Sequence, residues 1–223
     1  ETRKRGVLFM VDASQSAGST IIDTERSNID ILAFPGHKGL LGPQGSGGLY
    51  IRKGIDIIPL TEGGTGSLSE SLLQPDILPD RYESGTLNVP SIVGLLSGVK
   101  YLQKVGIYEI ERHEKELSTV LAEDFSMIKG VKLVGSPFSG EHSAVLSIVT
   151  PVDCISLADK LYSDYGICVR AGLHCAPLAH KTLGTFDTGT VRFSPGPFTT
   201  KPEIKKAAYA LYRCLKESKK NRC

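Results

Sequence analysis

The sequence has 223 residues, of which 40% are apolar and 22% are charged, and its formal net charge is +2 at pH 7. This composition is typical of a globular chain of one or two domains, and its charge balance gives no reason to expect a nucleic-acid partner. No apolar run approaches membrane-spanning length, so no membrane partner is expected. The five cysteines, an odd number without a Cys-x-x-Cys pair, indicate reduced thiols in a cytoplasm and no metal site.

The N-terminal segment predicts two neighbouring strands of an open α/β sheet. Residues 6–12 and 30–34 are apolar runs, which we expect to form buried parallel strands. Asp12 ends the first run, and Lys38 follows the second in a loop rich in glycine. Such sheets bind ligands beyond the carboxyl ends of their strands, so Asp12 and Lys38 are expected on one edge. The pair could be a salt bridge, or an imine-forming amine with a carboxylate that keeps a pyridinium nitrogen protonated.

The next part of the chain predicts one more strand, a long irregular segment and two helices. Residues 47–52 form an apolar run that we expect to pair antiparallel with the strand before it. Residues 55–82 contain several prolines and glycines and are expected to be irregular and mobile. Apolar residues recur at helical spacing in residues 91–105 and 108–128.

The remainder predicts a second, small domain. The expected elements are strands at 131–134, 144–149, 167–169 and 191–193, and helices at 154–165 and 201–219. This alternation of helices and strand pairs favours an α+β layer. The sequence therefore predicts a large-domain part over residues 1–90 and a small domain over residues 91–223.

Cys175 lies in the run Arg170-Ala-Gly172-Leu-His174-Cys175-Ala-Pro177. Its place between a glycine and a proline predicts an exposed loop, and basic neighbours at Arg170, His174 and His180 favour a reactive thiolate. The other internal cysteines are expected to be buried and inert: Cys154, Cys168 and Cys214.

Arg192 lies in the apolar run of residues 191–193. An arginine is rarely buried without a partner, so this position predicts either a structural ion pair or an anionic ligand such as a carboxylate.

Taken together, Asp12, Gln15, the pair His37-Lys38, Cys175 and Arg192, in this order, resemble the class V aminotransferases of fold type I, and most closely the cysteine desulfurases. The resemblance implies an α/β fold: part of a fold-type-I large domain, with a mostly parallel sheet whose N-terminal part is absent, followed by a small α+β C-terminal domain. The chain then corresponds to the C-terminal half of the family. We therefore expect the chain of 223 residues by itself to bind the cofactor weakly or not at all and to be inactive.

The resemblance implies pyridoxal 5'-phosphate as the cofactor and a homodimer as the assembly. Lys38 forms the imine with the cofactor, Asp12 pairs with its ring nitrogen, Gln15 donates to its phenolic oxygen and His37 lies near its phosphate. Thr86 reaches the phosphate of the partner subunit's cofactor. Where the family usually has a hydroxyl residue, two positions before His37, this chain has a proline.

The resemblance also implies the reaction. Arg192 binds the α-carboxylate of L-cysteine, Cys175 attacks its sulfur to become a persulfide, and alanine leaves. The sulfur then passes to an acceptor protein, as in iron–sulfur cluster assembly. Arg170 either supports the cysteine loop or contacts the substrate. The alternatives are a selenocysteine lyase, a class V aminotransferase that does not need Cys175, and an inactive fragment.

Overall fold

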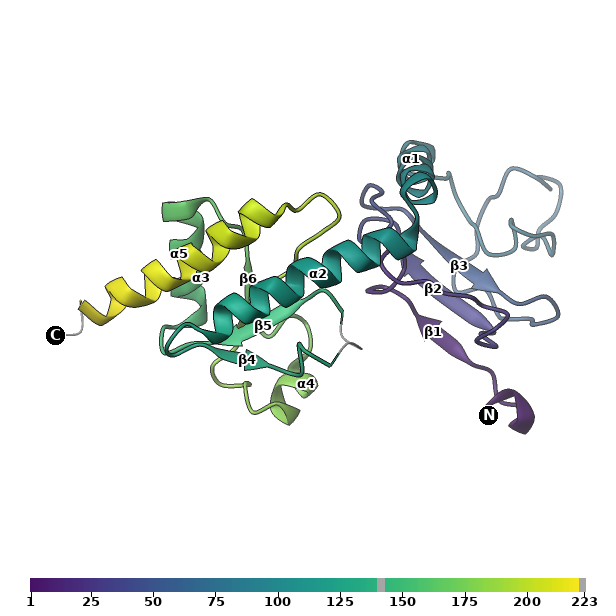
Figure 1. The fold of residues 1–223 in the computed structure, drawn as a ribbon. Helices are drawn as coiled ribbons and strands as arrows, with labels where there is room; N and C mark the ends of the chain where they lie inside the picture. The colour runs from purple at the N-terminus through teal and green to yellow at the C-terminus, as the bar shows by residue number, and fades with distance from the viewer. Residues whose placement is uncertain (140–142, 221–223) are drawn as a thin grey trace. The chain divides into compact units, whose positions relative to one another are not determined.

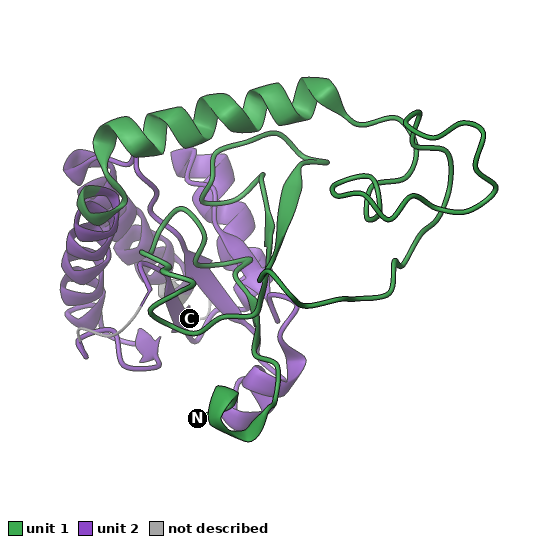
Figure 2. Ribbon diagram, turned by 90° about the vertical axis from the view of Figure 1, so that its right-hand side faces the viewer, with its two compact units in different colours: residues 1–109 green, residues 110–223 purple. Residues whose placement is uncertain are grey.

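The computed structural model describes residues 1–139 and 143–220 (Figure 1). It divides into two compact units, Glu1–Glu109 and Ile110–Cys223, which Figure 2 shows in green and purple. Each unit is described by itself below. None of the helices in the described ranges is long and apolar enough to cross a membrane.

The first unit contains a three-stranded sheet in the order β1-β2-β3. After a short 3-10 turn at Arg3–Arg5, its strands are β1 (Met10–Asp12), β2 (Ile31–Pro35) and β3 (Gly47–Ile51). β1 pairs with β2 in parallel and β2 with β3 antiparallel, so both predicted pairings are confirmed. Within the described residues the sheet is therefore mixed rather than mostly parallel.

β1 is shorter and more exposed than the sequence predicts. Val7, Leu8 and Met10 are each more than half exposed, although they belong to the run expected to be buried. The reason is that β1 is an edge strand, and other described residues cover its side chains only in part. From this run, Val11 packs against the small core that Ala13, Ile29 and Leu32 form in this unit.

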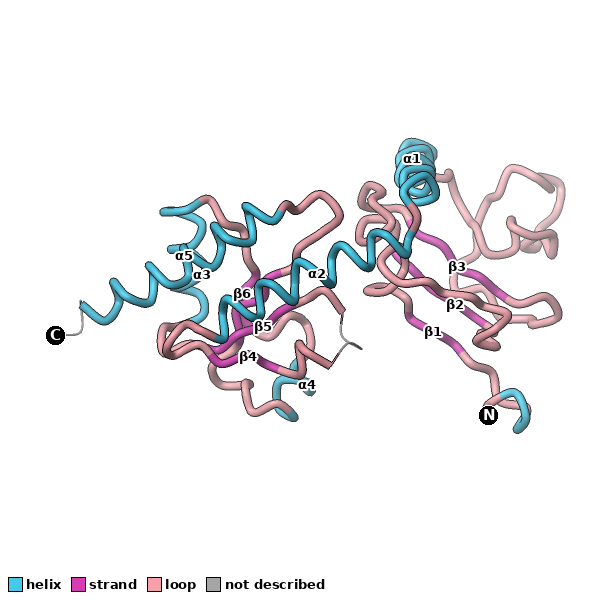
Figure 3. Tube along the Cα trace, in the orientation of Figure 1, coloured by secondary structure: helices cyan, strands magenta, loops and turns pink. Residues whose placement is uncertain are grey.

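The segment between β3 and α1 (Val89–Val105) contains no helix or strand among its described residues, as predicted, and Figure 3 draws it as a continuous loop. α1 begins at a proline-containing turn, where the side chain of Asn88 accepts a hydrogen bond from the backbone N–H of Ser91. The same serine donates from Oγ to the carbonyl oxygen of Gln44 at 3.2 Å.

α1 packs on the loop that follows Lys38. A Cβ atom added at Gly98 would overlap the carbonyl oxygen of Leu40, and one added at Gly94 would lie 2.5 Å from Pro43. Only glycine lets the helix backbone come this close. α1 thus belongs to the first compact unit, which ends at Glu109, and the expected division into domains between residues 90 and 91 stays a prediction.

The second unit is a four-stranded antiparallel sheet with helices against one face (Figures 1 and 3). The strands follow the order β4-β5-β7-β6. α2 (Ile107–Ser126) begins at the end of the first unit and continues into the second. The elements that follow in chain order are β4 (Lys132–Val134), β5 (Leu146–Val149), α3 (Cys154–Tyr165), β6 (Arg170–Gly172), α4 (Pro177–Thr182), β7 (Thr190–Phe193) and α5 (Lys201–Lys220).

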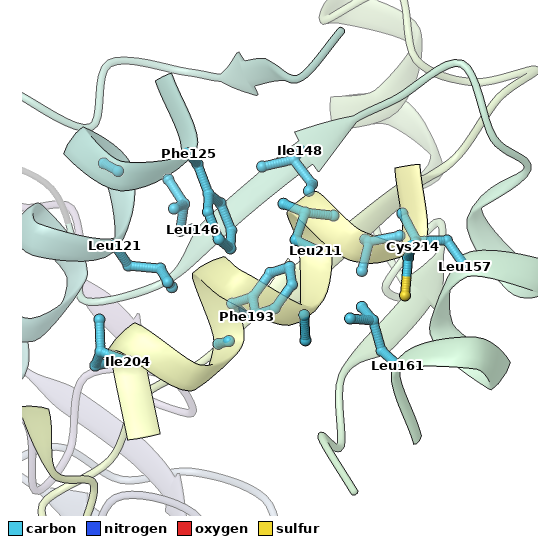
Figure 4. Packing of buried hydrophobic residues seen from close by; sticks show 14 of the residues in the cluster. Leu121, Phe125, Leu146, Ile148, Leu157, Leu161, Phe193, Ile204, Leu211 and Cys214 are labelled. Atoms are coloured by element: carbon cyan, nitrogen blue, oxygen red, sulfur yellow. The ribbon is translucent and has the colours of Figure 1, made fainter. Parts of the chain in front are cut away.

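The core of this unit lies between the sheet and α2, α3 and α5 (Figure 4). Phe125 of α2 meets Phe193 of β7 edge to face, with ring centroids 4.8 Å apart. Alternate strand residues such as Ile148 and Val191 also enter this core. Because side chains alternate across a strand, Arg192 lies on the sheet face away from the core.

One predicted strand is wrong, and one helix was not predicted. Residues 167–169 do not form a strand, because Gly166 and Ile167 cap α3 by donating their backbone N–H groups to Tyr162 and Leu161. The strand begins only at Arg170, and α4 follows the cysteine turn. Cys168 is exposed, which corrects its expected burial, whereas Cys154 and Cys214 are buried as predicted.

Candidate active site

In the first unit, the carboxyl ends of β1 and β2 bring the Asp12 and Lys38 loops together. The two strands run in parallel with Asp12 opposite Ala33, so both chains leave the sheet at the same edge. The loops then meet backbone to backbone, because a Cβ atom added at Gly18 would overlap the carbonyl group of Gly39. Gly39 directly follows Lys38, so this contact fixes the lysine loop beside the aspartate loop.

Asp12 is held in its ionised form. The backbone N–H of Ser14 donates to Asp12 Oδ1 at 2.8 Å, and the Ser14 hydroxyl donates to the same oxygen. These hydrogen bonds, with a smaller contribution from the charge of Lys38, lower the pKa of the Asp12 carboxyl. The site therefore offers a carboxylate that can accept a hydrogen bond from a cationic N–H group.

The other predicted residues of this unit are exposed. No hydrogen bond or ion pair of the side chains of Gln15, His37, Lys38 or Thr86 is found in the described part of the chain. The Lys38 loop is closed by its own backbone, since Leu41 N–H donates to the Lys38 carbonyl oxygen at 2.9 Å. The structure thus joins the loops of Asp12 and Lys38, but it shows no contact between Thr86 and either of them.

In the second unit, Cys175 lies on a turn between β6 and α4 that forces two unusual backbone conformations. His174 and Cys175 have φ angles of 52° and 61°, in the left-handed region that side-chain-bearing residues avoid. Consecutive strained residues of this kind are concentrated at functional sites. The turn leaves Cys175 exposed, as predicted, and Arg170 donates from Nη2 to its sulfur at 3.2 Å.

His174 does not supply the positive charge that the sequence predicts. Its Nε2 lies 2.8 Å from the hydroxyl of Thr190, and its ring centroid is 5.6 Å from that of the buried His180. Burial, and then the charges of Arg192, His180 and Arg170, lower the pKa of His174 to about 4. His174 is therefore neutral at pH 7, and Arg170 is the cation in direct contact with the thiol.

Arg192 lies directly opposite Arg170 in the pairing of β6 with β7. Its Nε is buried without a hydrogen-bond partner among residues 1–139 and 143–220. Burial, and then the charge of Arg170, lower the pKa of the Arg192 guanidinium, whereas Cys175 acts in the opposite direction. Neither arginine forms an ion pair with a carboxylate in the described part of the chain, so the structural ion pair considered for Arg192 is not found there.

Two residues of the site were missed by the sequence analysis. Ser14 could have been found, because a serine two positions after an aspartate is a common turn in which the aspartate accepts from the backbone. Thr190 had no such signal, since it is 16 residues from the histidine that it contacts.

The sequence over residues 1–207 matches the family described as Aminotransferase class-V, and the chain therefore belongs to that family. Within it, curated relatives of the chain carry a more specific description. The chain is 37% identical over 206 residues to a probable cysteine desulfurase of Methanothermobacter thermautotrophicus, an alignment that covers 89% of this chain and 51% of the relative. It is 36% identical over 210 residues to a probable cysteine desulfurase of Pyrococcus abyssi, covering 91% and 51% of the two chains.

Solved structures give the same result. The apo structure of a cysteine desulfurase from Thermococcus onnurineus NA1 superposes with a TM-score of 0.82 at 31% identity, covering 96% of this chain and 54% of that one. The cysteine desulfurase CsdA (S-sulfonic acid) from Escherichia coli superposes with a TM-score of 0.84 at 28% identity, covering 96% and 53%. The predicted membership of this family is confirmed, and the chain spans about half the length of the relatives it matches.

Proposed function

We propose that, at the full length of its relatives, this protein is a pyridoxal-phosphate-dependent cysteine desulfurase that converts L-cysteine to L-alanine and keeps the sulfur as a persulfide on Cys175. The observation that carries the proposal is the contact between Arg170 and the exposed sulfur of Cys175, beside an arginine with an unpaired buried Nε. The names of the relatives support the same reaction. In this proposal the two units are the end of a fold-type-I large domain and a small C-terminal domain.

The residues of the first unit fit the cofactor. Ionised Asp12 would accept a hydrogen bond from the ring nitrogen, and the exposed Lys38 would hold the cofactor covalently. Gln15 would donate to the phenolic oxygen, and His37 would lie near the phosphate. Pro35, the last residue of β2, has no N–H or hydroxyl to offer, so the phosphate has one donor fewer here. When bound, pyridoxal 5'-phosphate supplies an imine-forming aldehyde and a ring that takes up electrons from the α-carbon.

The residues of the second unit fit the substrate. The guanidinium of Arg192 would bind the α-carboxylate of L-cysteine, which supplies the anion that its unpaired Nε lacks. Nζ of Lys38 would remove the α-proton. The sulfur of Cys175 would then form a bond to the substrate sulfur as the carbon–sulfur bond breaks, and that carbon keeps the electron pair and takes a proton as alanine is formed.

Arg170 has its own place in this reaction. It already donates to Cys175, and its opposite neighbour Arg192 is the group proposed to bind the carboxylate. We assign Arg170 to holding the attacking sulfur rather than the carboxylate. The sulfur is thus in contact with the charged guanidinium of Arg170, whereas the neighbouring His174 is neutral at pH 7.

The proposed assembly is a homodimer in which Thr86 reaches the partner subunit's cofactor, and the persulfide passes to a sulfur-acceptor protein, as in iron–sulfur cluster assembly. A cytoplasmic location is proposed because the described cysteines are free thiols. A selenocysteine lyase would use the same residues. A class V transaminase would need Asp12, Lys38 and Arg192 but not the strained cysteine turn, which is the observation that favours the desulfurase.

The first test replaces the nucleophile. Cys175→Ser at full length is expected to abolish persulfide formation from L-cysteine while the cofactor stays bound, because Cys175 and Lys38 belong to different units. Cys168→Ser is the matched control, since Cys168 is also exposed but is not in contact with an arginine in the described structure. Persulfide formation that survives in Cys175→Ser would reject the assignment.

The second test replaces the amine. Lys38→Ala is expected to remove both the covalent attachment of the cofactor and all turnover. Borohydride reduction of the wild-type protein, followed by peptide mapping, identifies the attached lysine. Label on any other lysine would contradict the proposal.

A further inference from the structure

Arg170, Arg192 and Cys175 form a group that we call the arginine–cysteine face. The two arginines are register partners on adjacent strands, on the side of the sheet away from the core, and Arg170 contacts the sulfur. No carboxylate within the described residues pairs with either guanidinium. The face therefore carries two positive charges beside one exposed sulfur.

This arrangement is unfavourable without an anion. Like charges directly opposite each other on a sheet destabilise it, and a partly buried guanidinium with an unpaired N–H group has lost water without gaining a partner. In the proposed desulfurase reaction the substrate carboxylate is that anion. Once alanine has left, Arg192 Nε is again without a partner, and Arg170 lies against the sulfur that carries the transferable atom.

We propose that the arginine–cysteine face also binds small sulfur oxyanions, and that Cys175 exchanges a single sulfur atom with them: its persulfide gives sulfur to sulfite, and its free thiolate takes sulfur from thiosulfate. The first direction rests on the proposed function, because it needs the persulfide. The second direction needs only the thiolate and the two arginines.

The exchange balances without any redox partner. In the forward step, the lone pair of the sulfite sulfur attacks the outer persulfide sulfur, a new sulfur–sulfur bond forms, and the old one breaks with its electron pair left on Cys175 Sγ. The products are thiosulfate and the thiolate. The reverse step is thiolate attack on the outer sulfur of thiosulfate with sulfite as the leaving group.

The residues of the face match this chemistry. The planar guanidinium of Arg192 can bind two oxyanion oxygens at once, and Arg170 stabilises negative charge on Sγ, which grows in the forward step. No proton moves in either direction. The neutral His174 is therefore not required as an acid or base, and its role is confined to holding the turn through Thr190.

The reverse step can be tested on the chain itself. The reduced chain is incubated with thiosulfate labelled in its outer sulfur, released sulfite is measured, and the labelled cysteine is identified by peptide mapping. We expect label on Cys175 with an equal amount of sulfite, and none in Cys175→Ser. Arg170→Gln and Arg192→Gln should each slow labelling about tenfold or more, the effect of losing one charge-assisted hydrogen bond. Cys168→Ser, which removes the other thiol that is exposed among the described residues, should label like wild type.

A second measurement needs no variant. Sulfate, like thiosulfate, is a dianion with oxygens around a central sulfur, but it has no outer sulfur to transfer. It should therefore slow labelling of Cys175 by competition, whereas chloride at equal ionic strength should not. Equal labelling of Cys168 and Cys175, no effect of sulfate, or no labelling would each overturn the proposal.

The two proposals fail separately. At full length, Lys38→Ala should lose alanine formation and keep the thiosulfate reaction, because Lys38 takes no part in it. A wild-type protein that forms alanine and persulfide but does not react with thiosulfate or sulfite would reject the oxyanion site and leave the proposed function intact. Thiosulfate exchange without alanine formation would reject the proposed function and leave the oxyanion site intact.

Discussion

The Nε2 atom of His174 lies 2.8 Å from the hydroxyl oxygen of Thr190, and this contact ties the turn that carries Cys175 to β7, the strand that carries Arg192. The turn is strained at His174 and Cys175, so an external contact is needed to hold it. Thr190 is 1% exposed, which makes this contact resistant to competition from water. Cys175, the proposed nucleophile, and Arg192, the residue proposed to bind the carboxylate, are thereby fixed relative to each other within one unit.

Removing the Thr190 hydroxyl should loosen this link. Thr190→Val keeps the shape of the side chain but leaves the half-buried His174 without its partner, at a cost of about 1–3 kcal/mol in the free energy of unfolding. The matched control is Thr182→Val, because Thr182 is exposed and its hydroxyl bonds only to its own helix. Urea unfolding of both variants measures the difference, and equal losses would show that the His174 contact has no special role.

The lowered pKa of His174 predicts a pH dependence of stability. The folded-state value of about 4 lies below the ordinary value of 6.5, so the unfolded chain binds a proton first as the pH falls. The stability that His174 contributes is complete above pH 6.5 and is lost between pH 6.5 and 4, by on the order of 1–2 kcal/mol after allowance for solvent screening.

The variant that isolates this effect is His174→Gln, which can still bond to Thr190 but cannot titrate. Its free energy of unfolding should fall less than that of wild type over the same pH range, as measured by chemical denaturation. Parallel curves for the two proteins would contradict the assignment of a neutral His174.

The close approach of Gly18 and Gly39 should not tolerate a methyl group. Gly18→Ala would overlap the Gly39 backbone and would also sit at a φ of 91°, so we expect a loss of about 2 kcal/mol or more and separation of the Asp12 and Lys38 loops. Gly54→Ala is the matched control, because its φ is 89° but nothing lies within 4 Å of the added atom. If both variants lose the same stability, backbone strain alone explains the effect and the loop contact is absent.

Glu114 of α2 should be a source of instability near neutral pH. Its side chain is 9% exposed, and burial raises the pKa of its carboxyl above the ordinary value. Ionisation of Glu114 therefore destabilises the folded chain at pH values above the raised pKa. This destabilisation disappears as the pH falls through the raised pKa toward 4.5.

Glu114→Gln should accordingly raise the free energy of unfolding by on the order of 0.5–1 kcal/mol at pH 8, and the gain should vanish below pH 4.5. Glu123→Gln on the same helix is the control, since Glu123 is exposed and should change stability little at either pH. A pH-independent gain would show that ionisation of Glu114 is not its cause.

The sequence predicted those features of the site that follow from local order along the chain. Asp12 and Lys38 each follow an apolar run, and parallel pairing of the two runs was enough to place them at one edge. Cys175 between Gly172 and Pro177 was likewise enough to predict an exposed loop.

The features that depend on contacts between distant residues could not be predicted. The neutral state of His174 arises from burial and from the charge of Arg192, which is 18 positions away in the sequence. The strand predicted at residues 167–169 was misplaced because the cap of α3 uses the backbone of Gly166 and Ile167. The packing of α1 on the Lys38 loop depends on Gly98. In a helical sequence pattern a glycine counts only as a poor helix former and does not indicate a contact.

The most direct test of the central claim is to measure the products formed from L-cysteine by the protein at the full length of its relatives, with pyridoxal 5'-phosphate and without any keto acid. The account predicts alanine in amounts equal to the persulfide on Cys175 in the first turnover, and no alanine in Lys38→Ala. Alanine that appears only when a keto acid is added, or that forms unchanged in Cys175→Ser, would contradict it.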